Sequence, residues 1–512
     1  MANDEFGDFQ TPFELADACL GAMARVLGLR RDEPYRVLEP TCGTGSFMRA
    51  SAGIFPRSEV IGVEIQGRYA TSAARYGSVI RKSIFDVDFR AELSWKNSGP
   101  LIVIGNPPWV TATELGRLGS ANLPKKSNFK GKAGLDALLG GSNFDIAEYV
   151  ILQCVSKNLN QSFTLGMLCK TQVARNVMEY SWKERIPVVS SAIFKIDALK
   201  WFKANVDACW FVMECAPTTA CCYRTRIYES LSETHSERNF GIVNGSWVSN
   251  IALYESSSQA DGTCPYVWRS GLKHDAVNVL ELTPSEPTVN RLSEPVDVEQ
   301  EYVFPYLKAT DVHKGAVTKS RFMVIVPQTE FGEDTDRLRS VAPKLWNYLD
   351  SHGDVLDGRR SSIYRKRPRF SVFGLGDYTW AKYKVAVSGL HKTVDFRLIG
   401  DIGGKPVVVD DTCYLLPFDE PCEAAVVCAL LNSEASRALI ESLVFWDSKR
   451  PISKKLLSRI DVSKIPAPKE EVLEEAARLS EEIGVHCDAW FLDRAYDKIR
   501  GSAEERATAR LL

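Results

Sequence analysis

An apolar run that ends in two consecutive prolines constrains this chain more than any other feature of its sequence. Leu101–Ile104 has the length and composition of one buried strand. Pro107 and Pro108 then stop the strand, because proline can neither donate to a β-ladder nor continue regular structure. The stretch therefore predicts that Asn106 and Trp109 lie on a stiff turn at the carboxyl end of a strand, where open α/β sheets bind their ligands.

The polar groups of this turn suit an amino group that has two N–H donors. Asn106 offers a side-chain carbonyl and Pro107 a main-chain carbonyl. An exocyclic or amide NH₂ is a poor nucleophile because its lone pair is delocalised, and accepting both of its hydrogens frees that lone pair. Trp109 adds a flat face on which a planar substrate can stack. The alternative is a Pro-Pro turn with a core tryptophan.

Three segments upstream also place polar residues or glycines where strands are expected to end. A strand over 35–38 leads into a glycine turn, one over 60–63 leads into an acid, and a β-like stretch near 79–80 leads into a short polar segment. Together with the turn at 106–109, these strand ends predict one ligand crevice. Glu39 in this crevice repels a diphosphate and attracts an ammonium or sulfonium centre, and the third glycine of a nicotinamide-binding motif is absent.

A helix is predicted just before the first of these strands. Thr11 has the side chain of a helix N-cap, Pro12 suits the first helical position, and Glu14 completes a capping box. Apolar residues recur behind them at helical spacing. On its own, the segment indicates a well-capped helix.

The order of these motifs resembles that of the amino-methyltransferases that use S-adenosylmethionine. More closely, the chain resembles the gamma-class N6-adenine DNA methyltransferases with their Asn-Pro-Pro-Trp motif. Specific motifs cover roughly residues 1–215, and beyond them only the layout is similar, with the catalytic domain first and the target-recognition domain last. The resemblance implies an α/β fold, in which a Rossmann-like class I methyltransferase domain precedes a mixed α+β target-recognition domain. It also implies S-adenosylmethionine as the cofactor and double-stranded DNA as the partner.

The resemblance implies catalytic roles for five residues. Asn106, Pro107, Pro108 and Trp109 match the catalytic motif of the family. In the gamma class, an aromatic residue before a later strand stacks on the extruded adenine, and Phe202, ahead of the apolar run 209–213, is the best match. An aromatic core pair formed with its neighbour is the alternative for Phe202.

The resemblance also implies cofactor contacts along the crevice. Glu64 matches the acid that binds the ribose hydroxyls, although an acid ending a strand can also simply be solvated. Where the family has an acid against the cofactor adenine, the register here gives Ser83, with Asp86 three residues later. The full set implied to bind the cofactor is Thr11, Pro12, Glu39, Pro40, Gly43, Gly45, Glu64, Ser83, Asp86 and Asn106.

The carboxyl half is informative mainly through its charge. The stretch 355–398 contains ten lysines and arginines against three acids, interleaved with aromatic residues. Such a local excess suits a phosphate-contacting surface, which a chain of net charge −2 needs if it is to bind a polyanion. A solvated face is the ordinary alternative. The residues predicted to contact DNA are Arg359, Arg360, Arg365, Lys366, Arg367, Arg369, Lys449 and Arg450.

Length and composition bound the organisation of the chain. With 512 residues, two or three domains are expected. We predict a methyltransferase domain over 1–217, a connecting segment over 218–299, a DNA target-recognition domain over 300–468 and a C-terminal helix over 469–512. The sequence has no run of eighteen apolar residues and no secretory signal, which predicts a cytoplasmic protein without membrane contact. The thirteen cysteines are scattered without a C-x-x-C pair, so neither a disulfide framework nor a metal site is expected.

The sequence therefore predicts a site-specific adenine-N6 DNA methyltransferase, in a restriction-modification or phage-defence setting, with a separate restriction endonuclease or defence subunits as possible partners. Duplex DNA is expected to bind between the two domains with the target adenine flipped out. The sequence disfavours cytosine-C5 transfer, because positions 105–110 lack the cysteine nucleophile. Cytosine-N4 transfer, transfer to RNA adenine or guanine, protein glutamine methylation and a non-catalytic DNA-binding subunit remain open.

Overall fold

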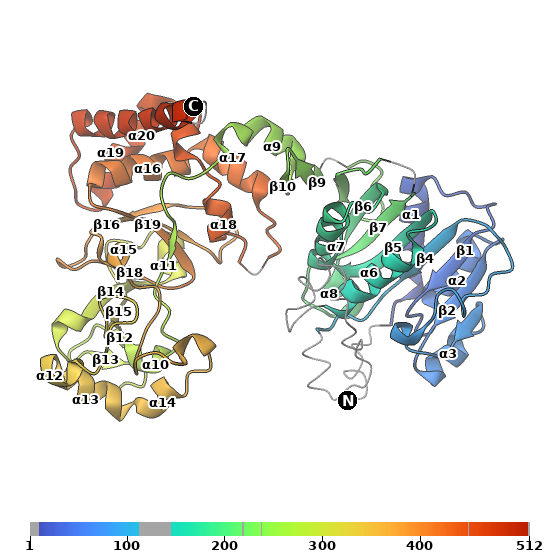
Figure 1. Cartoon of the computed structure of the whole chain (residues 1–512), viewed down its shortest axis with the longest axis horizontal. Coiled ribbons are helices and arrows are strands. Elements are labelled where there is room, and N and C mark those ends of the chain that lie inside the picture. Colours follow the sequence, from blue (N-terminus) through green and yellow to red (C-terminus); the bar gives the residue numbers. More distant parts are fainter. Residues whose placement is uncertain (1–9, 112–144, 218–219, 237, 449, 510–512) are drawn as a thin grey trace. The chain divides into compact units, whose positions relative to one another are not determined.

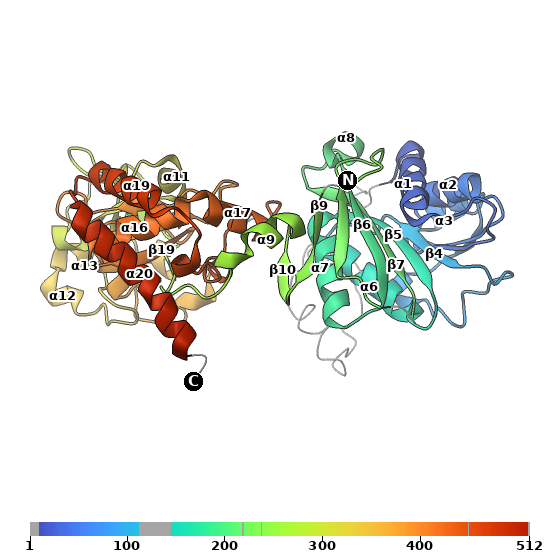
Figure 2. The same ribbon diagram turned by 90° about the horizontal axis from the view of Figure 1, so that it is seen from above.

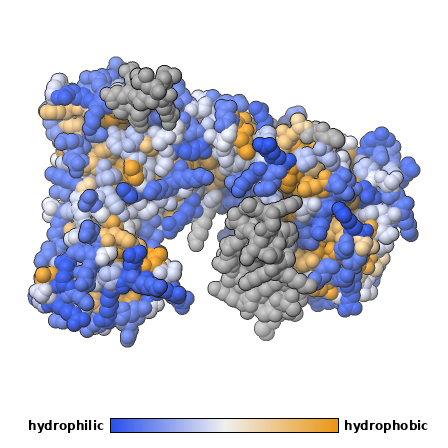
Figure 3. All heavy atoms as spheres, in the orientation of Figure 1, coloured by the Kyte–Doolittle hydropathy of each residue, from blue (hydrophilic) through white to orange (hydrophobic). Residues whose placement is uncertain are grey.

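The computed structural model describes residues 10–111, 145–217, 220–236, 238–448 and 450–509 (Figure 1). It divides into two compact units, Met1–Ile251 and Ala252–Leu512. On the face shown in Figure 3, hydrophilic residues predominate in both units, with apolar residues in small groups among them. Among the described residues, no helix combines the length and the apolar composition that a membrane span requires.

One large sheet organises the first unit. Its ten strands lie in the order β10-β9-β8-β6-β7-β5-β4-β1-β2-β3. The strands from β3 to β5 pair in parallel, whereas β7 is antiparallel to both β5 and β6. The strands are β1 (Arg36–Glu39), β2 (Glu59–Val63), β3 (Ser78–Ile80), β4 (Leu101–Gly105), β5 (Phe163–Lys170), β6 (Val188–Ile196), β7 (Ala208–Cys215), β8 (Arg224–Tyr228), β9 (Arg238–Val243) and β10 (Ser246–Val248).

Helices cover both faces of this sheet. Figure 2 shows α1 and α2 on one face and α6 and α7 on the other. Local signals set their limits: Gly28 in the left-handed conformation ends α1, and the Asp145 side chain accepts from the Ala147 amide to cap α6. The helices of the unit are α1 (Phe13–Leu27), α2 (Ser46–Ile54), α3 (Gly67–Ala73), α6 (Ile146–Asn158), α7 (Thr171–Lys183) and α8 (Ala198–Phe202).

The start of α1 differs from the sequence prediction. The helix begins at Phe13, with Pro12 rather than Thr11 at the N-cap position and without a side-chain cap. The carbonyl of Pro12 accepts from the amides of Leu15 and Ala16, so the main chain closes the first turn. The Thr11 hydroxyl is instead engaged by a distant residue of the cleft described below, which explains why the capping signal was overridden.

The second unit contains two smaller sheets. A five-stranded sheet has the order β13-β12-β15-β14-β18, and a four-stranded sheet has the order β11-β19-β16-β17. The first comprises β12 (Glu281–Thr283), β13 (Val289–Asn290), β14 (Val303–Leu307), β15 (Phe322–Ile325) and β18 (Val408–Val409). The second comprises β11 (Arg269–Ser270), β16 (Tyr383–Ser388), β17 (Arg397–Ile399) and β19 (Cys413–Phe418).

Helices surround these two sheets. Among them α16, α19 and α20 pack against one another at the carboxyl end of the chain (Figures 1 and 2). The helices are α9 (Ile251–Ser257), α10 (Val277–Leu280), α11 (Ala309–Lys314), α12 (Leu338–Val341), α13 (Pro343–Ser351), α14 (Gly353–Asp357), α15 (Asp377–Trp380), α16 (Pro421–Asn432), α17 (Glu434–Leu443), α18 (Lys454–Leu457), α19 (Lys469–Glu482) and α20 (Ala489–Ala509).

Two predicted segments are organised differently in the structure. The first sheet continues through β8, β9 and β10 to Val248, so part of the predicted connecting segment 218–299 belongs to it. The described part of the predicted C-terminal helix, residues 469–509, forms two helices, because Gly484 adopts a left-handed conformation with φ 75° between them. The first of these helices buries Val472, Ala476 and Leu479.

Candidate active site

A cleft opens at the carboxyl ends of β1, β2 and β4, as the strand-end argument predicted. It encloses about 770 Å³ of empty space, including its mouth to solvent. Each of five chain segments supplies a part of its wall, because parallel strands end at the same edge of the sheet. The predicted site residues that line it are Thr11, Glu39, Pro40, Gly43, Glu64, Ser83, Asn106, Pro107 and Pro108.

Five predicted site residues lie outside this lining: Pro12, Gly45, Asp86, Trp109 and Phe202. Gly45 has φ 89°, and a Cβ there would lie 2.9 Å from the Cα of Ala73. Packing of the turn before α2 against the end of α3 therefore requires glycine here. Of the two alternatives for the adenine contact, Ser83 faces the cleft, whereas Asp86 is exposed outside it.

Glu64 ties the glycine turn to the second strand. Its carboxylate accepts one hydrogen bond from the Gly43 amide at 2.8 Å and another from the Gln66 amide at 2.7 Å. The side chain is 8% exposed and borders the cleft. Because a carboxylate oxygen has more than one lone pair, these bonds fix the acid while leaving acceptor capacity for a ligand.

Glu39 is a buried acid at the floor of the same cleft. Its side chain is 3% exposed and accepts a hydrogen bond from the Met48 amide at 3.0 Å. Burial, and to a smaller extent the neighbouring carboxylate of Glu64, hold the pKa of Glu39 well above its usual value. No lysine, arginine or histidine of the described chain forms an ion pair with it. The site therefore suits a ligand that brings a positive charge of its own.

Asn106 is held at the cleft by the residue that was expected to cap α1. Its side-chain nitrogen donates to the Thr11 hydroxyl at 3.2 Å, and the Thr41 hydroxyl lies 3.5 Å from its main-chain oxygen. This contact fixes the position of the Asn106 amide beside the cleft.

Trp109 and Phe202 contact each other directly. Their ring centroids are 5.1 Å apart with an interplanar angle of 69°. The indole nitrogen of Trp109 donates to the carbonyl of Leu168 at 3.2 Å, and the side chain is 6% exposed. The two aromatic residues predicted to stack on the base therefore lie together. Their edge-to-face contact leaves no gap between the rings for a base. Stacking of a base between the two rings requires them to separate.

An ion pair missed by the sequence analysis supports the turn that follows β4. The Lys170 ammonium donates to the main-chain oxygen of Trp109 at 3.1 Å and to the Asp145 carboxylate at 2.8 Å. Asp145 also forms a β-bridge with Thr111, so the chain leaving the turn is joined to the start of α6. Lys170 ends β5, which is paired with the strand before Asn106. The position of Lys170 at the end of a strand that neighbours β4 is the signal that could have identified it from the sequence.

The predicted DNA-contacting residues fall into two groups. Arg360, Arg365, Lys366 and Arg367 are exposed, and the Arg367 guanidinium lies over the exposed ring of Phe331. The other described members are engaged by acceptors of the protein itself, although Arg369 and Arg450 are also exposed. Lys449 lies outside the described residues.

The residues of the second group donate to main-chain oxygens or pair with carboxylates of the same protein. Arg359 donates to the main-chain oxygens of Leu356 and Ser371, each at 2.7 Å, and burial lowers its pKa. Arg369 forms ion pairs with Asp350 and Asp357, and Arg450 lies 3.6 Å from Asp411. Lys384, one of the counted cations, is 1% exposed. The surface excess of positive charge is therefore smaller than the sequence count.

Comparison with known proteins identifies the class and then the family. The whole chain resembles the structure of the restriction-modification enzyme MmeI in complex with DNA, with a TM-score of 0.51 at 12% identity over 96% of this chain and 72% of MmeI. This likeness concerns the fold alone. Together with the strand order, it confirms the expected Rossmann-like methyltransferase domain followed by a further α/β domain.

Sequence similarity is stronger than this structural likeness. No protein-family model matches the chain. The type II methyltransferase M.NspV from Nostoc sp. is 38% identical over 469 residues, which cover 90% of this chain and 96% of that protein. A shorter match of 36% over 106 residues, 20% of this chain and 25% of the relative, relates it to the type II methyltransferase M.CvrRI of a Paramecium bursaria Chlorella virus. The chain belongs to the type II methyltransferase family.

Proposed function

We propose that this chain transfers a methyl group from S-adenosylmethionine to the N6 amino group of a flipped-out adenine in double-stranded DNA, in a restriction-modification or phage-defence setting. Family membership makes it a DNA methyltransferase of the restriction-modification kind. The observation that carries the finer assignment is Asn106, whose amide nitrogen is anchored by Thr11 at the edge of the cleft. In the proposal, the amide oxygen of Asn106 and the main-chain carbonyl of Pro107 act as the pair of acceptors for one NH₂ group.

The residues of the cleft fit this cofactor. Glu64 offers remaining acceptor sites for the ribose hydroxyls, and Ser83 lines the wall where the cofactor adenine is expected. Burial raises the pKa of Glu39, and no cation of the described residues pairs with it, so an ammonium or a sulfonium group would stabilise its carboxylate. When bound, the cofactor supplies an electrophilic methyl group on sulfur.

The residues of the turn then act on the target base. Asn106 and the Pro107 carbonyl accept the two amino hydrogens, which localises the nitrogen lone pair toward the methyl group. With S-adenosylmethionine bound, these two acceptors would hold the amino nitrogen while it takes the methyl group from the sulfonium, which would leave as a neutral thioether, and the surplus proton on nitrogen would pass to solvent. Catalysis here consists of positioning and electrostatic stabilisation, without a covalent enzyme intermediate.

The aromatic pair supplies the base pocket in this proposal. An adenine inside a duplex cannot present its amino group in the required geometry, so it must leave the stack. The edge-to-face contact of Trp109 and Phe202 is exchanged for stacking on the extruded base. Their contact in the DNA-free state then protects two apolar rings until the base arrives.

Substitution of Asn106 by alanine tests the proposal. Asn106→Ala is expected to lower methyl transfer at least about a hundredfold, since it removes one of two transition-state acceptors. Binding of S-adenosylmethionine, measured by calorimetry, is expected to persist. The matched control is Asn97→Ala, at an amide in the turn before β4 begins and so at the opposite edge of the sheet. Retained turnover in Asn106→Ala would remove the assignment.

The identity of the product tests the target base. Digestion of methylated DNA to nucleosides is expected to yield N6-methyladenine. N4-methylcytosine as the product would keep the amino chemistry and overturn the choice of base. Transfer to structured RNA in preference to duplex DNA would overturn the substrate.

A further inference from the structure

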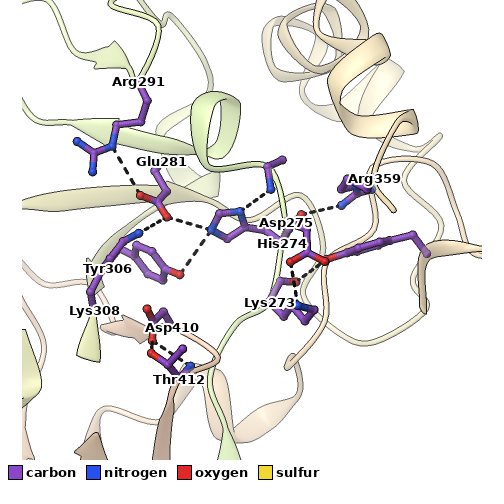
Figure 4. Close-up of polar contacts among 12 residues, drawn as sticks. Lys273, His274, Asp275, Glu281, Arg291, Tyr306, Lys308, Arg359, Asp410 and Thr412 are labelled. Atoms are coloured by element: carbon purple, nitrogen blue, oxygen red, sulfur yellow. Dashed lines mark hydrogen bonds and ion pairs between the residues drawn. The ribbon is translucent and has the colours of Figure 1, made fainter. Parts of the chain in front are cut away.

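The five-stranded sheet of the second unit holds a carboxylate that is almost fully buried. Glu281, the first residue of β12, is 1% exposed. One oxygen accepts from the Lys308 ammonium at 2.5 Å and lies 3.4 Å from the His274 imidazole, while Arg291 lies 3.7 Å from the other oxygen (Figure 4). Burial alone would raise the pKa of Glu281, but the hydrogen bonds from His274 and Lys308 outweigh it and lower the pKa.

Stability alone does not account for this arrangement. Moving a carboxylate from water to the protein interior costs several kcal/mol, and well-packed apolar residues are often as stable as a buried ion pair. What Glu281 does achieve is the fixation of two cations that remain partly exposed. The side chains of Arg291 and Lys308 are 34% and 26% exposed, respectively.

Arg291 is held in one orientation by contacts on two sides. Its Nε is directed at Glu281, and its guanidinium lies over the Phe322 ring, 4.2 Å from the ring centroid. Figure 4 shows the two terminal nitrogens on the side of the guanidinium turned away from Glu281. The Nε of Arg291 is thus held by Glu281, while its two terminal nitrogens can still donate to a ligand.

The main chain that carries Arg291 is also fixed. The preceding residue, Asn290, is 2% exposed, and its side-chain oxygen accepts from the amides of Leu292 and Glu294. Its side-chain nitrogen donates to the Glu294 carboxylate and to the Tyr348 hydroxyl. A turn built in this way places the Arg291 side chain with little freedom, which a sequence-reading contact needs and a simple phosphate contact does not.

Further positive charge surrounds the same aromatic ring. The Arg321 guanidinium lies 5.1 Å and the Lys308 ammonium 5.9 Å from the Phe322 ring centroid. Arg321 in turn is bonded to Asp311, whose side chain is 4% exposed. Since both acids are buried and the cations reach the surface, this face presents positive charge to an approaching polyanion.

We infer that Arg291 reads a guanine in the DNA recognition sequence through a bidentate contact, with Glu281 and Phe322 as its positioning residues. The inference rests on the proposed function, because DNA is the substrate that the site would read. The Arg291 fork matches the O6 and N7 acceptors that guanine presents in the major groove. Lys308 and Arg321 beside it suit the flanking phosphates.

Substitution of Arg291 by lysine separates base reading from charge. Lysine keeps the positive charge but lacks the fork, so Arg291→Lys is expected to lower discrimination at one guanine position of the methylated motif by about 5–150-fold. Discrimination at the other positions is expected to persist. The measurement is sequencing that detects N6-methyladenine in DNA from expressing cells, followed by methylation rates on oligonucleotides that differ at each motif position.

Arg339 provides a matched control. Its guanidinium also stacks on an aromatic ring, 4.3 Å from the Trp346 centroid, and its Nε is also 3.7 Å from a carboxylate, that of Asp336. That carboxylate is 66% exposed, so Arg339 is not held by a buried acid as Arg291 is. Arg339→Lys is therefore expected to leave the selectivity of the enzyme unchanged.

The outcomes distinguish the inference from the function on which it rests. An even loss of affinity for all sequences in Arg291→Ala, restored by Arg291→Lys, would make Arg291 a phosphate contact and overturn the inference. Unchanged selectivity in both variants would also overturn it. If the wild-type protein modifies no DNA while still folded and binding S-adenosylmethionine, the proposed function itself fails.

Discussion

The first unit buries Glu39 in its cleft and the second buries Glu281 in its five-stranded sheet, and the surroundings of these two glutamates differ in charge. Glu39 is 3% exposed and Glu281 is 1% exposed. Burial is the largest influence on both, yet the pKa of Glu39 is raised whereas the pKa of Glu281 is lowered. The difference lies in the neighbours: Glu39 faces a second carboxylate, while His274 and Lys308 donate to Glu281.

In the two proposals above, this difference separates a site that would bind a cation from a site that would display one. Glu39 accepts from the Met48 amide but pairs with no cation among the described residues, so a ligand that supplies positive charge would stabilise its carboxylate. A buried acid with built-in partners is already satisfied and instead fixes their positions. The comparison predicts opposite responses to the same substitution in the two units.

Loss of the carboxylate charge is expected to have its largest effect at Glu281. Glu281→Gln leaves Lys308 and Arg291 beside a neutral amide, and breaking a buried pair in this way typically destabilises a protein by about 3–5 kcal/mol. Urea denaturation, followed by circular dichroism, measures the change in the free energy of unfolding.

The matched substitution at the other glutamate completes this test. Glu39→Gln is expected to change the stability of the cofactor-free protein by less than about 1 kcal/mol, because a carboxyl with a raised pKa already resembles the neutral amide. Equal destabilisation by the two substitutions would break the comparison.

Lys384 extends the comparison of buried charges to a basic side chain. It is 1% exposed, its ammonium donates to the Ala381 carbonyl, and burial lowers its pKa to about 7. Each unit of pKa difference corresponds to about 1.4 kcal/mol, so Lys384→Met is expected to stabilise the protein by a few kcal/mol at pH 7. Lys382→Met, at the exposed neighbouring lysine, is the control.

The pH dependence of this effect has a defined sign. Between pH 7 and the ordinary lysine pKa near 10.4, the unfolded chain binds the proton that the folded chain has released, so wild-type stability rises with pH. The advantage of Lys384→Met should therefore shrink between pH 7 and pH 9, as measured by denaturation at both values. An advantage that stays constant with pH would show that Lys384 is already satisfied.

The Lys170–Asp145 pair is an intermediate case, because it is partly exposed and yet contacts the turn proposed to be catalytic. Its side chains are 27% and 11% exposed. Lys170→Met frees the carbonyl of Trp109, and a small displacement of the turn is expected to lower kcat by about 10–100-fold. Lys170→Arg should restore part of the rate, and Lys183→Met is the control. Steady-state kinetics measures the change in kcat, and calorimetry measures cofactor binding. A changed cofactor affinity with a normal kcat would contradict the positioning role of Lys170.

The cleft could be predicted from sequence because its signals are local. Glu39, Glu64 and Asn106 each follow an apolar run directly, so strand ends and their polar residues are visible along the chain. Thr11 shows the limit of this reasoning. It lines the cleft, as expected, but its hydroxyl binds Asn106, 95 residues away, rather than capping a helix. The contact between Trp109 and Phe202 also depends on tertiary packing, so its geometry could not be predicted.

The second unit could not be predicted in this way, because its informative contacts are long-range. Glu281 follows an ordinary apolar stretch, and its partners His274, Arg291 and Lys308 lie at no common spacing. Counting charges in the stretch 355–398 treated all cations alike, although packing turns Lys384 inward. A count of charged residues contains no information about which of them reach the surface.

The smallest predicted effect concerns proton release at Glu39. A cationic ligand favours the carboxylate, so binding of S-adenosylmethionine should lower the raised pKa of Glu39 and release a proton at pH values between the free and bound pKa. Cofactor affinity then rises with pH across that window, by up to about tenfold per pH unit, and levels off above the pKa of the cofactor-free protein. Calorimetry in two buffers with different ionisation enthalpies measures the released proton. Glu39→Gln should abolish this contribution, and subtracting its titration from the wild-type titration removes protons that come from the cofactor itself. Equal proton release by both proteins would mean that Glu39 is already ionised before the cofactor binds, and the contrast with Glu281 would disappear.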